Sequence, residues 1–229
     1  MDPMSLRAVA SDYDGTLTCS GALSDEVFRA LREAREAGLA LVLATGRRLD
    51  DIRLVIPDAD ALFDALVVEN GCIVARPGRA PLSLAEPVSD ALLLAMRAQA
   101  IPTARGSVLL ATYAHHRAQV ESLVESMGLD VRLFQNRAAL MILPGSISKA
   151  TGVAHALGLL GIDPSQAEGL GDAENDRELL ERCGLGVAVA DAVDELKAVA
   201  DRVLELPDGE GAAALLRELA RAARGEASR

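Results

Sequence analysis

The chain has 229 residues, half of them apolar and a quarter charged, which is an ordinary globular composition. Its net charge of −11 argues against a nucleic-acid partner, because neutralising phosphates requires clustered Lys and Arg. No stretch is long and apolar enough to cross a membrane and no signal segment opens the chain, so we expect a cytoplasmic protein without a membrane partner.

Three isolated cysteines, Cys19, Cys72 and Cys183, show no spacing typical of metal ligands. An odd and scattered set predicts free thiols in a reducing compartment rather than a disulfide framework.

Short apolar runs alternate with helical patterns in the first third of the chain. Strands are expected at residues 7–11, 39–44 and 65–68, and a helix over 24–36 separates the first two. Continuous apolar runs are typical of strands buried on both faces, as in a parallel sheet.

The pattern changes at residues 76–87, where several Pro and Gly residues predict a linker. Over 88–143 we expect a helix, a strand, a second helix and a hairpin of two strands. The alternation then resumes with further predicted elements: a helix over 148–160, an apolar stretch before Gly171, a helix over 175–182, a strand over 186–190 and a tail over 225–229.

These elements together predict an α/β fold. A doubly wound, Rossmann-like parallel sheet is expected from residues 1–80 and 146–229, and residues 81–145 are expected to form an inserted small α+β cap domain.

The segment DYDGTLT, residues 12–18, follows the first predicted strand directly. Ligands of open parallel sheets bind outside the carboxyl ends of the strands, so Asp12 and Asp14 lie where a site is expected. Two carboxylates two residues apart can share one metal ion while one attacks phosphorus and forms an acyl phosphate. The alternative is an acidic turn without chemistry.

Two further motifs follow predicted strands. Thr45, Gly46 and Arg47 offer a hydroxyl and backbone amides that could bind phosphate at a helix start, although an ordinary turn has the same pattern. Asp172, in the segment GDAEND, could lie beside Asp12 and complete an oxygen-rich site suited to Mg²⁺. The helix dipole alone also favours acidic residues at such a position.

Lys149 stands out because only it and Lys197 are lysines among the 23 basic residues. Keeping Lys here in a chain that otherwise uses Arg indicates a need for a compact charge at this position. Lys149 also falls in the first turn of a predicted helix, where the dipole disfavours a cation. Overriding two local preferences is typical of a functional residue, and compositional chance is the alternative.

In this order and spacing, the motifs resemble the haloacid dehalogenase superfamily of phosphohydrolases, over about residues 4–73 and 146–219. The resemblance implies Mg²⁺ as cofactor and Asp12 as nucleophile and metal ligand. It implies Asp14 as general acid/base with its backbone carbonyl on the metal, and Asp172 as the third protein ligand of the metal.

The same resemblance implies a set of residues around the phosphoryl group. Asp176 would support the metal shell or the lysine. The residues expected to bind the phosphate or the substrate are Thr45, Gly46, Arg47, Lys149 and Asn175.

The inserted module lies between the TGR and Lys segments, and ENG at residues 69–71 follows the third predicted strand. Both features resemble the Cof-type branch of the superfamily, which carries a cap over the site. The short cap is similar in size to those of archaeal-type phosphoglycolate phosphatases and sucrose-phosphate phosphatases. Polar cap residues that could contact substrate, or simply be solvated, are Arg105, Tyr113, His115, His116, Arg117 and Gln135.

We therefore expect hydrolysis of a small phosphorylated metabolite, phosphoglycolate or a sugar phosphate, by a monomer or homodimer. Two alternatives stay open at this point. One is a phosphomutase of similar architecture, in which the acyl phosphate returns to the substrate, and the other is a catalytically silent metabolite-binding protein.

Overall fold

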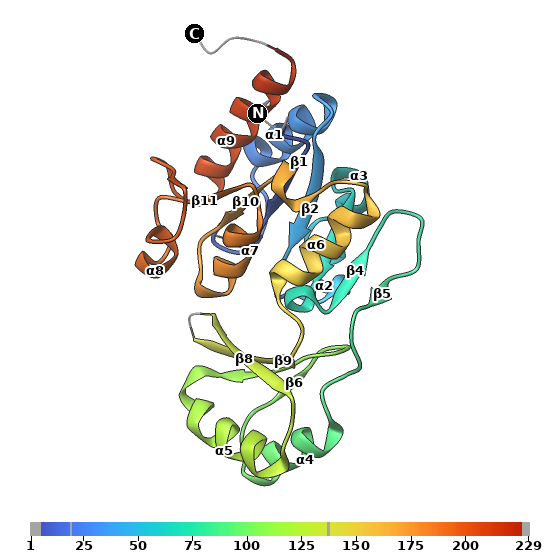
Figure 1. The fold of residues 1–229 in the computed structure, drawn as a ribbon, viewed down its shortest axis with the longest axis vertical. Helices are drawn as coiled ribbons and strands as arrows, with labels where there is room; N and C mark the ends of the chain where they lie inside the picture. The colour runs from blue at the N-terminus through green and yellow to red at the C-terminus, as the bar shows by residue number, and fades with distance from the viewer. Residues whose placement is uncertain (1–5, 19, 137, 226–229) are drawn as a thin grey trace.

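The computed structural model describes residues 6–18, 20–136 and 138–225 and contains two sheets (Figure 1). The larger sheet has eight strands in the order β12-β11-β10-β1-β2-β3-β4-β5. The smaller one has four strands in the order β6-β7-β9-β8 and lies in the lower body of Figure 1. We call this smaller sheet, with the two helices that pack on it, the cap.

The larger sheet is parallel from β12 through β3, and β4 and β5 extend it as antiparallel edge strands. Its strands are β1 (Ala8–Ser11), β2 (Ala40–Ala44), β3 (Ala65–Val68), β4 (Ile73–Ala75), β5 (Leu82–Ser83), β10 (Ala167–Gly171), β11 (Leu185–Ala188) and β12 (Arg202–Val203).

Helices cover both faces of this sheet because successive residues of the buried strands point to opposite sides. Val9 of β1 belongs to the apolar cluster under α1 and α9, whereas Ala8 and Ala10 belong to the cluster under α6 and α7. The helices are α1 (Asp25–Glu36), α2 (Leu49–Val55), α3 (Ala59–Leu62), α6 (Lys149–Leu159), α7 (Arg177–Arg182), α8 (Asp194–Lys197) and α9 (Asp208–Ala223). The predicted doubly wound α/β fold is therefore confirmed.

The cap is an antiparallel sheet with its own apolar core. In β9, Leu140 and Ile142 face the cap helices, and Met141 between them packs against the larger body. The elements are α4 (Asp90–Ala98), β6 (Ala104–Arg105), β7 (Leu110–Tyr113), α5 (Arg117–Met127), β8 (Val131–Asn136) and β9 (Ala139–Pro144). The predicted order of helix, strand, helix and hairpin is confirmed, with β6 as an additional short strand.

Short 3-10 turns join several elements at the edges of both sheets. They are η1 (Glu69–Gly71), η2 (Ala114–His116), η3 (Pro164–Gln166) and η4 (Glu174–Asp176). The helix predicted over 175–182 thus begins as η4 and becomes α-helical only at Arg177. The strand β5 falls inside the predicted linker, so the larger sheet continues to Ser83. The domain limits at residues 81 and 146 stay a prediction.

The two cysteines that the structure describes are free thiols. Burial raises the pKa of Cys72 and of Cys183 to about 12, so both are poorly reactive. Cys19 and residues 226–229 of the predicted tail lie outside the described residues.

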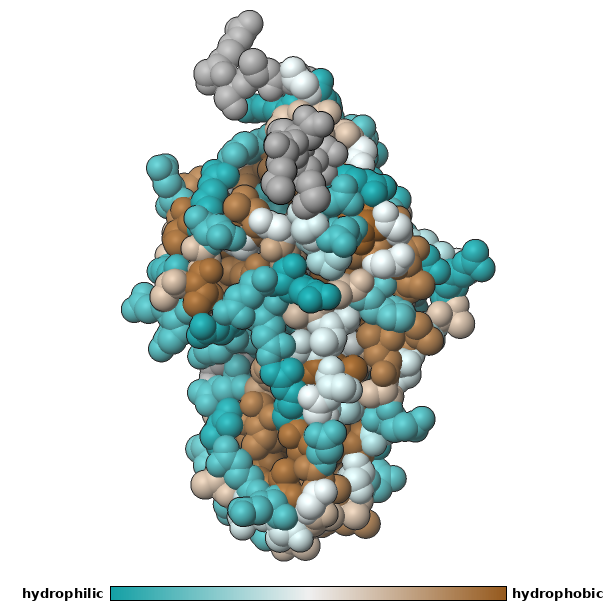
Figure 2. Space-filling view, viewed as in Figure 1, coloured by the Kyte–Doolittle hydropathy of each residue, from teal (hydrophilic) through white to brown (hydrophobic). Residues whose placement is uncertain are grey.

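The molecular face in Figure 2 mixes hydrophilic and apolar residues, and polar groups cover much of it. Within the described residues, no helix has the length and apolar character needed to span a membrane.

Glu168 on β10 is a buried carboxyl, and its Oε1 has no hydrogen-bond partner among the described residues. Burial raises the pKa of Glu168 to about 7, the nearby Arg202 opposes this shift, and Glu218 adds to it. Arg202 already donates two hydrogen bonds of 2.8 Å to Glu218. Glu168 is therefore held in a site that favours its neutral form.

Replacement of Glu168 by Gln should remove a pH dependence of folding stability. The unfolded carboxyl loses its proton near its ordinary pKa of 4.5 and the folded one near 7, so wild-type stability falls as pH rises between these values. Glu168→Gln should raise the unfolding free energy by roughly 2–3 kcal/mol at slightly alkaline pH and by little at acidic pH. Urea unfolding at both pH values measures this. The exposed Glu195→Gln on α8 is the control, and equal pH slopes in both variants would refute the assignment.

Candidate active site

The candidate catalytic residues meet at the carboxyl-terminal edge of the parallel strands. Asp12 follows β1, Thr45 follows β2 and Asp172 follows β10. Because β1 pairs in parallel with both β2 and β10, these three residues come to the same edge. The Asp12 amide donates a 2.9 Å hydrogen bond to the Leu170 carbonyl, which fixes its backbone beside β10.

Lys149 lies between two carboxylates at the centre of this edge. Its Nζ donates to Asp12 Oδ1 at 2.5 Å and to Asp176 Oδ1 at 2.7 Å, with all three side chains almost fully buried. Ser148 caps α6, so Lys149 is the first residue of that helix. The two carboxylates offset the unfavourable helix dipole at this position.

Burial and charge act in opposite directions on the Asp12–Lys149 pair. Burial alone lowers the pKa of Lys149, but Asp12 and Asp176 outweigh it, so the pKa rises and the ammonium stays charged. Burial raises the pKa of Asp12 well above its ordinary value, Lys149 lowers it, and Asp176 and Asp172 raise it again. Burial and the two neighbouring carboxylates thus favour the neutral form of Asp12, and Lys149 favours its charged form.

Asp172 approaches the Asp12 loop through a close backbone contact. Thr16 Oγ1 donates to Asp172 Oδ1 at 2.9 Å. Gly15 has φ +86°, and a Cβ at that position would lie only 2.3 Å from Asp172 Oδ2. Glycine is required here by both the conformation and the space.

Asp176 uses both of its oxygens within the protein. Oδ1 accepts from Lys149, and Oδ2 accepts from the backbone amides of Asp172 and Ala173 at 3.1 Å each. Its carboxylate therefore fixes the loop and the ammonium together, and it has little capacity left for a further ligand.

The cluster suits a hard divalent cation. Oxygens of Asp12, Asp172 and Asp176 lie within 4.8 Å of one another, all three residues are buried, and carboxylate oxygen is the donor that Mg²⁺ prefers. Three buried carboxylates face one ammonium, which leaves net negative charge for a cation to offset. Because Asp176 already accepts three hydrogen bonds, Asp12 and Asp172 are the side chains best placed to hold the ion.

Asp14 lies outside this cluster and forms a bidentate pair with Arg47. Arg47 Nε lies 2.7 Å from Asp14 Oδ2, and its terminal nitrogen NH2 lies 2.6 Å from Oδ1. The guanidinium also stacks 5.0 Å from the centre of the Tyr13 ring. The side chain of Asp14 is thus held at the rim, and its backbone carbonyl as a metal ligand stays a prediction.

Two more of the predicted phosphate-binding residues lie in the loops that follow β2 and β10. Thr45 Oγ1 accepts the Arg47 amide at 3.1 Å and thereby shapes the turn around Gly46. Asn175 Nδ2 donates to Asn70 Oδ1 at 3.1 Å, while its own Oδ1 is buried without a hydrogen bond among the described residues. An unpaired buried acceptor is costly and is common at sites that bind a ligand.

The polar cap residues predicted as substrate contacts are mostly engaged within the cap itself. Arg105 pairs with Asp90 at 3.0 Å, and Arg117 pairs with Glu121 at 3.1 Å. Tyr113 stacks on His115, which contacts His116. Gln135 lies exposed on β8, and its side chain is not free of interactions.

Different cap residues reach the larger body, and sequence reasoning did not identify them. Arg132 forms an ion pair with Glu178 of α7, and Met141 contacts Asn70 Nδ2. The only available signal was the alternation in β9, which points Met141 away from the cap helices that bury Leu140 and Ile142.

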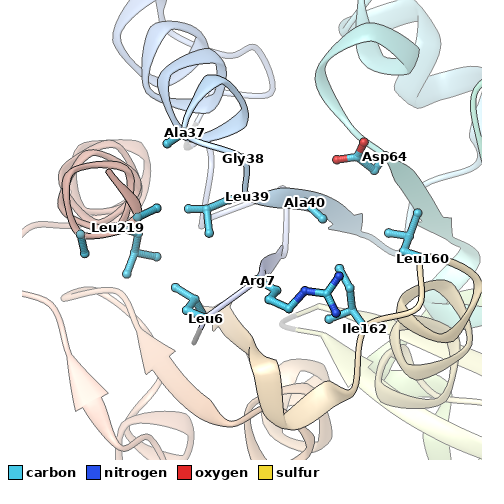
Figure 3. Close-up of a pocket in the computed structure, with 12 residues that line it drawn as sticks. Leu6, Arg7, Ala37, Gly38, Leu39, Ala40, Asp64, Leu160, Ile162 and Leu219 are labelled. Carbon is cyan, nitrogen blue, oxygen red and sulfur yellow. The ribbon is translucent and has the colours of Figure 1, made fainter. Parts of the chain in front are cut away.

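A cavity of about 600 Å³ lies at the opposite, amino-terminal edge of the larger sheet (Figure 3). It includes Arg7, which precedes β1, whereas Asp12 follows that strand. It is lined mainly by apolar groups and holds none of the clustered carboxylates, so it is separate from the candidate active site.

Removal of the Lys149 charge should make folding depend on a divalent cation. Lys149→Met leaves buried carboxylates without their ammonium, which should cost about 3–5 kcal/mol of stability in EDTA. Added Mg²⁺ should restore part of this loss and should stabilise the variant more than the wild type. Chemical denaturation with and without Mg²⁺ measures both effects.

Lys197→Met, at the other lysine of the chain, is the matched control and should behave as wild type. A Lys149→Met protein as stable in EDTA as this control would contradict the account of the charge cluster.

The chain is similar to known proteins in sequence and in fold. A family model described as haloacid dehalogenase-like hydrolase matches residues 9–89 and 108–216. A phosphoglycolate phosphatase of Methanopyrus kandleri is 31% identical over 226 residues, which cover 92% of this chain and 96% of the relative. One from Methanothermobacter thermautotrophicus is 30% identical, with 93% and 98% covered.

Solved structures share the fold at lower identity. A protein of Thermoplasma acidophilum has a TM-score of 0.81 at 19% identity and covers 94% of this chain and 98% of its own. A sugar phosphatase of haloacid dehalogenase subclass IIB has a TM-score of 0.78 at 18% identity, with 93% and 98% covered.

Proposed function

The chain belongs to the haloacid dehalogenase-like hydrolases and is a phosphatase of that family, and on this premise we propose that it hydrolyses a small phosphate monoester through a phosphoryl group carried on Asp12. The observation that carries the proposal is that Lys149 forms buried ion pairs with both Asp12 and Asp176 at the edge of the parallel sheet.

The surroundings of Asp12 support its role as nucleophile. Lys149 holds Oδ1, and Oδ2 accepts no hydrogen bond from the residues that the structure describes. Oδ2 is thus available to attack phosphorus, form the aspartyl phosphate and displace the ester oxygen with its electron pair. The Lys149 ammonium neutralises part of the charge that gathers as two anions approach.

Asp14 is the proposed general acid and base. It would donate a proton to the leaving oxygen, then take one from the water that attacks the aspartyl phosphate and releases inorganic phosphate. Its pairing with Arg47 holds it two residues from the nucleophile at the rim of the site. The Arg47 pair must therefore open, or shift to the substrate, before Asp14 can transfer a proton.

Asp12 and Asp172 are the side chains proposed to hold Mg²⁺, with the Asp14 carbonyl as a further ligand. When bound, the ion would offset negative charge and orient the phosphate. Thr16 and Gly15 position Asp172 for this task, and Asp176 keeps Lys149 and the loop in place.

The cap supports a small substrate, with 2-phosphoglycolate proposed first and a sugar phosphate second. Met141 contacts Asn70 and lies near the turn of residues 45–47, because a Cβ at Gly46 would approach its Cε to 2.7 Å. A cap side chain this close to the turn favours a compact leaving group. The relatives named phosphoglycolate phosphatases support the same choice.

Asp12→Asn should abolish phosphate release in the presence of Mg²⁺, because an amide cannot replace the attacking carboxylate. We expect a loss of at least about 10³-fold in kcat on an aryl phosphate and on a panel of phosphorylated metabolites. Wild-type activity should vanish in EDTA, return with Mg²⁺ and favour two- and three-carbon phosphorylated acids within the panel.

The exposed Asp25→Asn on α1 serves as control. Activity that survives Asp12→Asn would rule out the nucleophile. Conversion of one phosphate ester into its isomer, without phosphate release, would instead identify a phosphomutase.

A further inference from the structure

The carboxylate of Glu69, in the larger body, accepts hydrogen bonds from a loop of the cap. Glu69 Oε1 accepts the Ser107 amide at 2.7 Å, and Oε2 accepts the amides of Val108 and Leu109 at 2.9 and 3.3 Å. The residue is only 1% exposed. A buried carboxylate that receives three backbone N–H groups is held firmly, because each hydrogen bond to a charged group is stronger than a neutral one.

The loop is shaped around this carboxylate. A Cβ at Gly106 would lie 2.5 Å from Glu69 Oε2, so any larger residue there would collide with the carboxylate. The Val108 carbonyl accepts the Val88 amide at 2.8 Å, which ties the same loop to the segment that enters the cap. Glu69 therefore binds a loop that is itself bonded to the segment entering the cap.

The other side of Glu69 is bonded to the candidate active site. The Glu69 amide donates to the Arg47 carbonyl, and the Asn70 amide donates to the Thr45 carbonyl, at 2.9 Å each. A Cβ at Gly71 would collide with the backbone carbonyl of Ser148. Ser148 is the N-terminal capping residue of α6, the helix that begins with Lys149. The turn of residues 69–71 thus contacts both segments that carry the proposed phosphate-binding residues.

The backbone of this turn is strained. Glu69 and Asn70 have φ values of +51° and +53°, which non-glycine residues rarely adopt. Such conformations persist where the surroundings determine them, and they gather at functional sites. The strain directs the Glu69 side chain to the cap and the Asn70 side chain to Asn175 and Met141.

We propose that Glu69 is a positioning residue, whose carboxylate sets the placement of the cap over Asp12 and so determines how tightly the leaving group is held. This role rests on the proposed phosphatase function. Loss of the carboxylate frees the loop of residues 106–109 and lets Met141 move from Gly46. Contacts to the leaving group weaken, while the attack of Asp12 on a phosphate that needs no cap contact continues.

Glu69→Gln tests the role because a side-chain amide keeps the size but has one acceptor oxygen in place of two. The amides of Ser107, Val108 and Leu109 should exchange with deuterium about tenfold faster or more than in wild type. KM for the best metabolite of the panel should rise about tenfold, and kcat on a simple aryl phosphate should change less than about twofold.

The matched control is Glu86→Gln, at an exposed glutamate of the segment that enters the cap, and it should match wild type in both measurements. Gly106→Ala disturbs the same contact from the cap side and should reproduce the Glu69→Gln effects. It also tests the proposal if the Glu69 variant does not fold.

Hydrogen exchange needs no substrate, so it tests the contact even if the wild type releases no phosphate. Unchanged exchange in Glu69→Gln would overturn the proposal. Faster exchange with kcat and KM unchanged for every substrate, or with kcat falling equally on the metabolite and the aryl phosphate, would reduce Glu69 to a structural role and also overturn it.

Discussion

The structure depends on the buried ammonium of Lys149, which joins parts of the chain that are far apart in sequence. It binds Asp12 at the end of β1 and Asp176 in η4, and it comes from the first residue of α6. Without a cation, these carboxylates would face one another at the edge of the sheet. The ammonium thus allows several acidic residues to gather at the proposed phosphate site, in a protein whose net charge is −11.

The parallel sheet supplies the remaining geometry. Because β1, β2, β3 and β10 end at one edge, the loops that follow them meet there without long connections. Each loop contributes a different group to the site: a carboxylate, a turn proposed to bind phosphate, a turn that reaches the cap and a second acidic loop. The cap then contacts this edge through Glu69, Met141 and the Arg132–Glu178 ion pair.

Much of this arrangement could be predicted from the sequence because the strands are continuous apolar runs followed at once by polar motifs. Asp12 and Asp172 were predicted in this way, whereas Lys149 was predicted from the rarity of lysine and from its place in the first turn of a helix. The pairing of Asp14 with Arg47 could not be predicted, because it depends on side-chain conformations at the rim. The role of Glu69 was hidden because a positive φ in a non-glycine residue leaves no local pattern. The strand β5 escaped detection because two exposed residues carry no periodicity.

The central claim is that Asp12 carries the phosphoryl group during turnover. The most direct measurement is mass spectrometry of the peptide that contains Asp12, after acid quenching of the enzyme during turnover with Mg²⁺ and an aryl phosphate. The account predicts one added phosphoryl group on Asp12 in the wild type and none in Asp12→Asn. Rapid phosphate release with no phosphorylated Asp12 in the quenched wild type, or with the group on another residue, would contradict it.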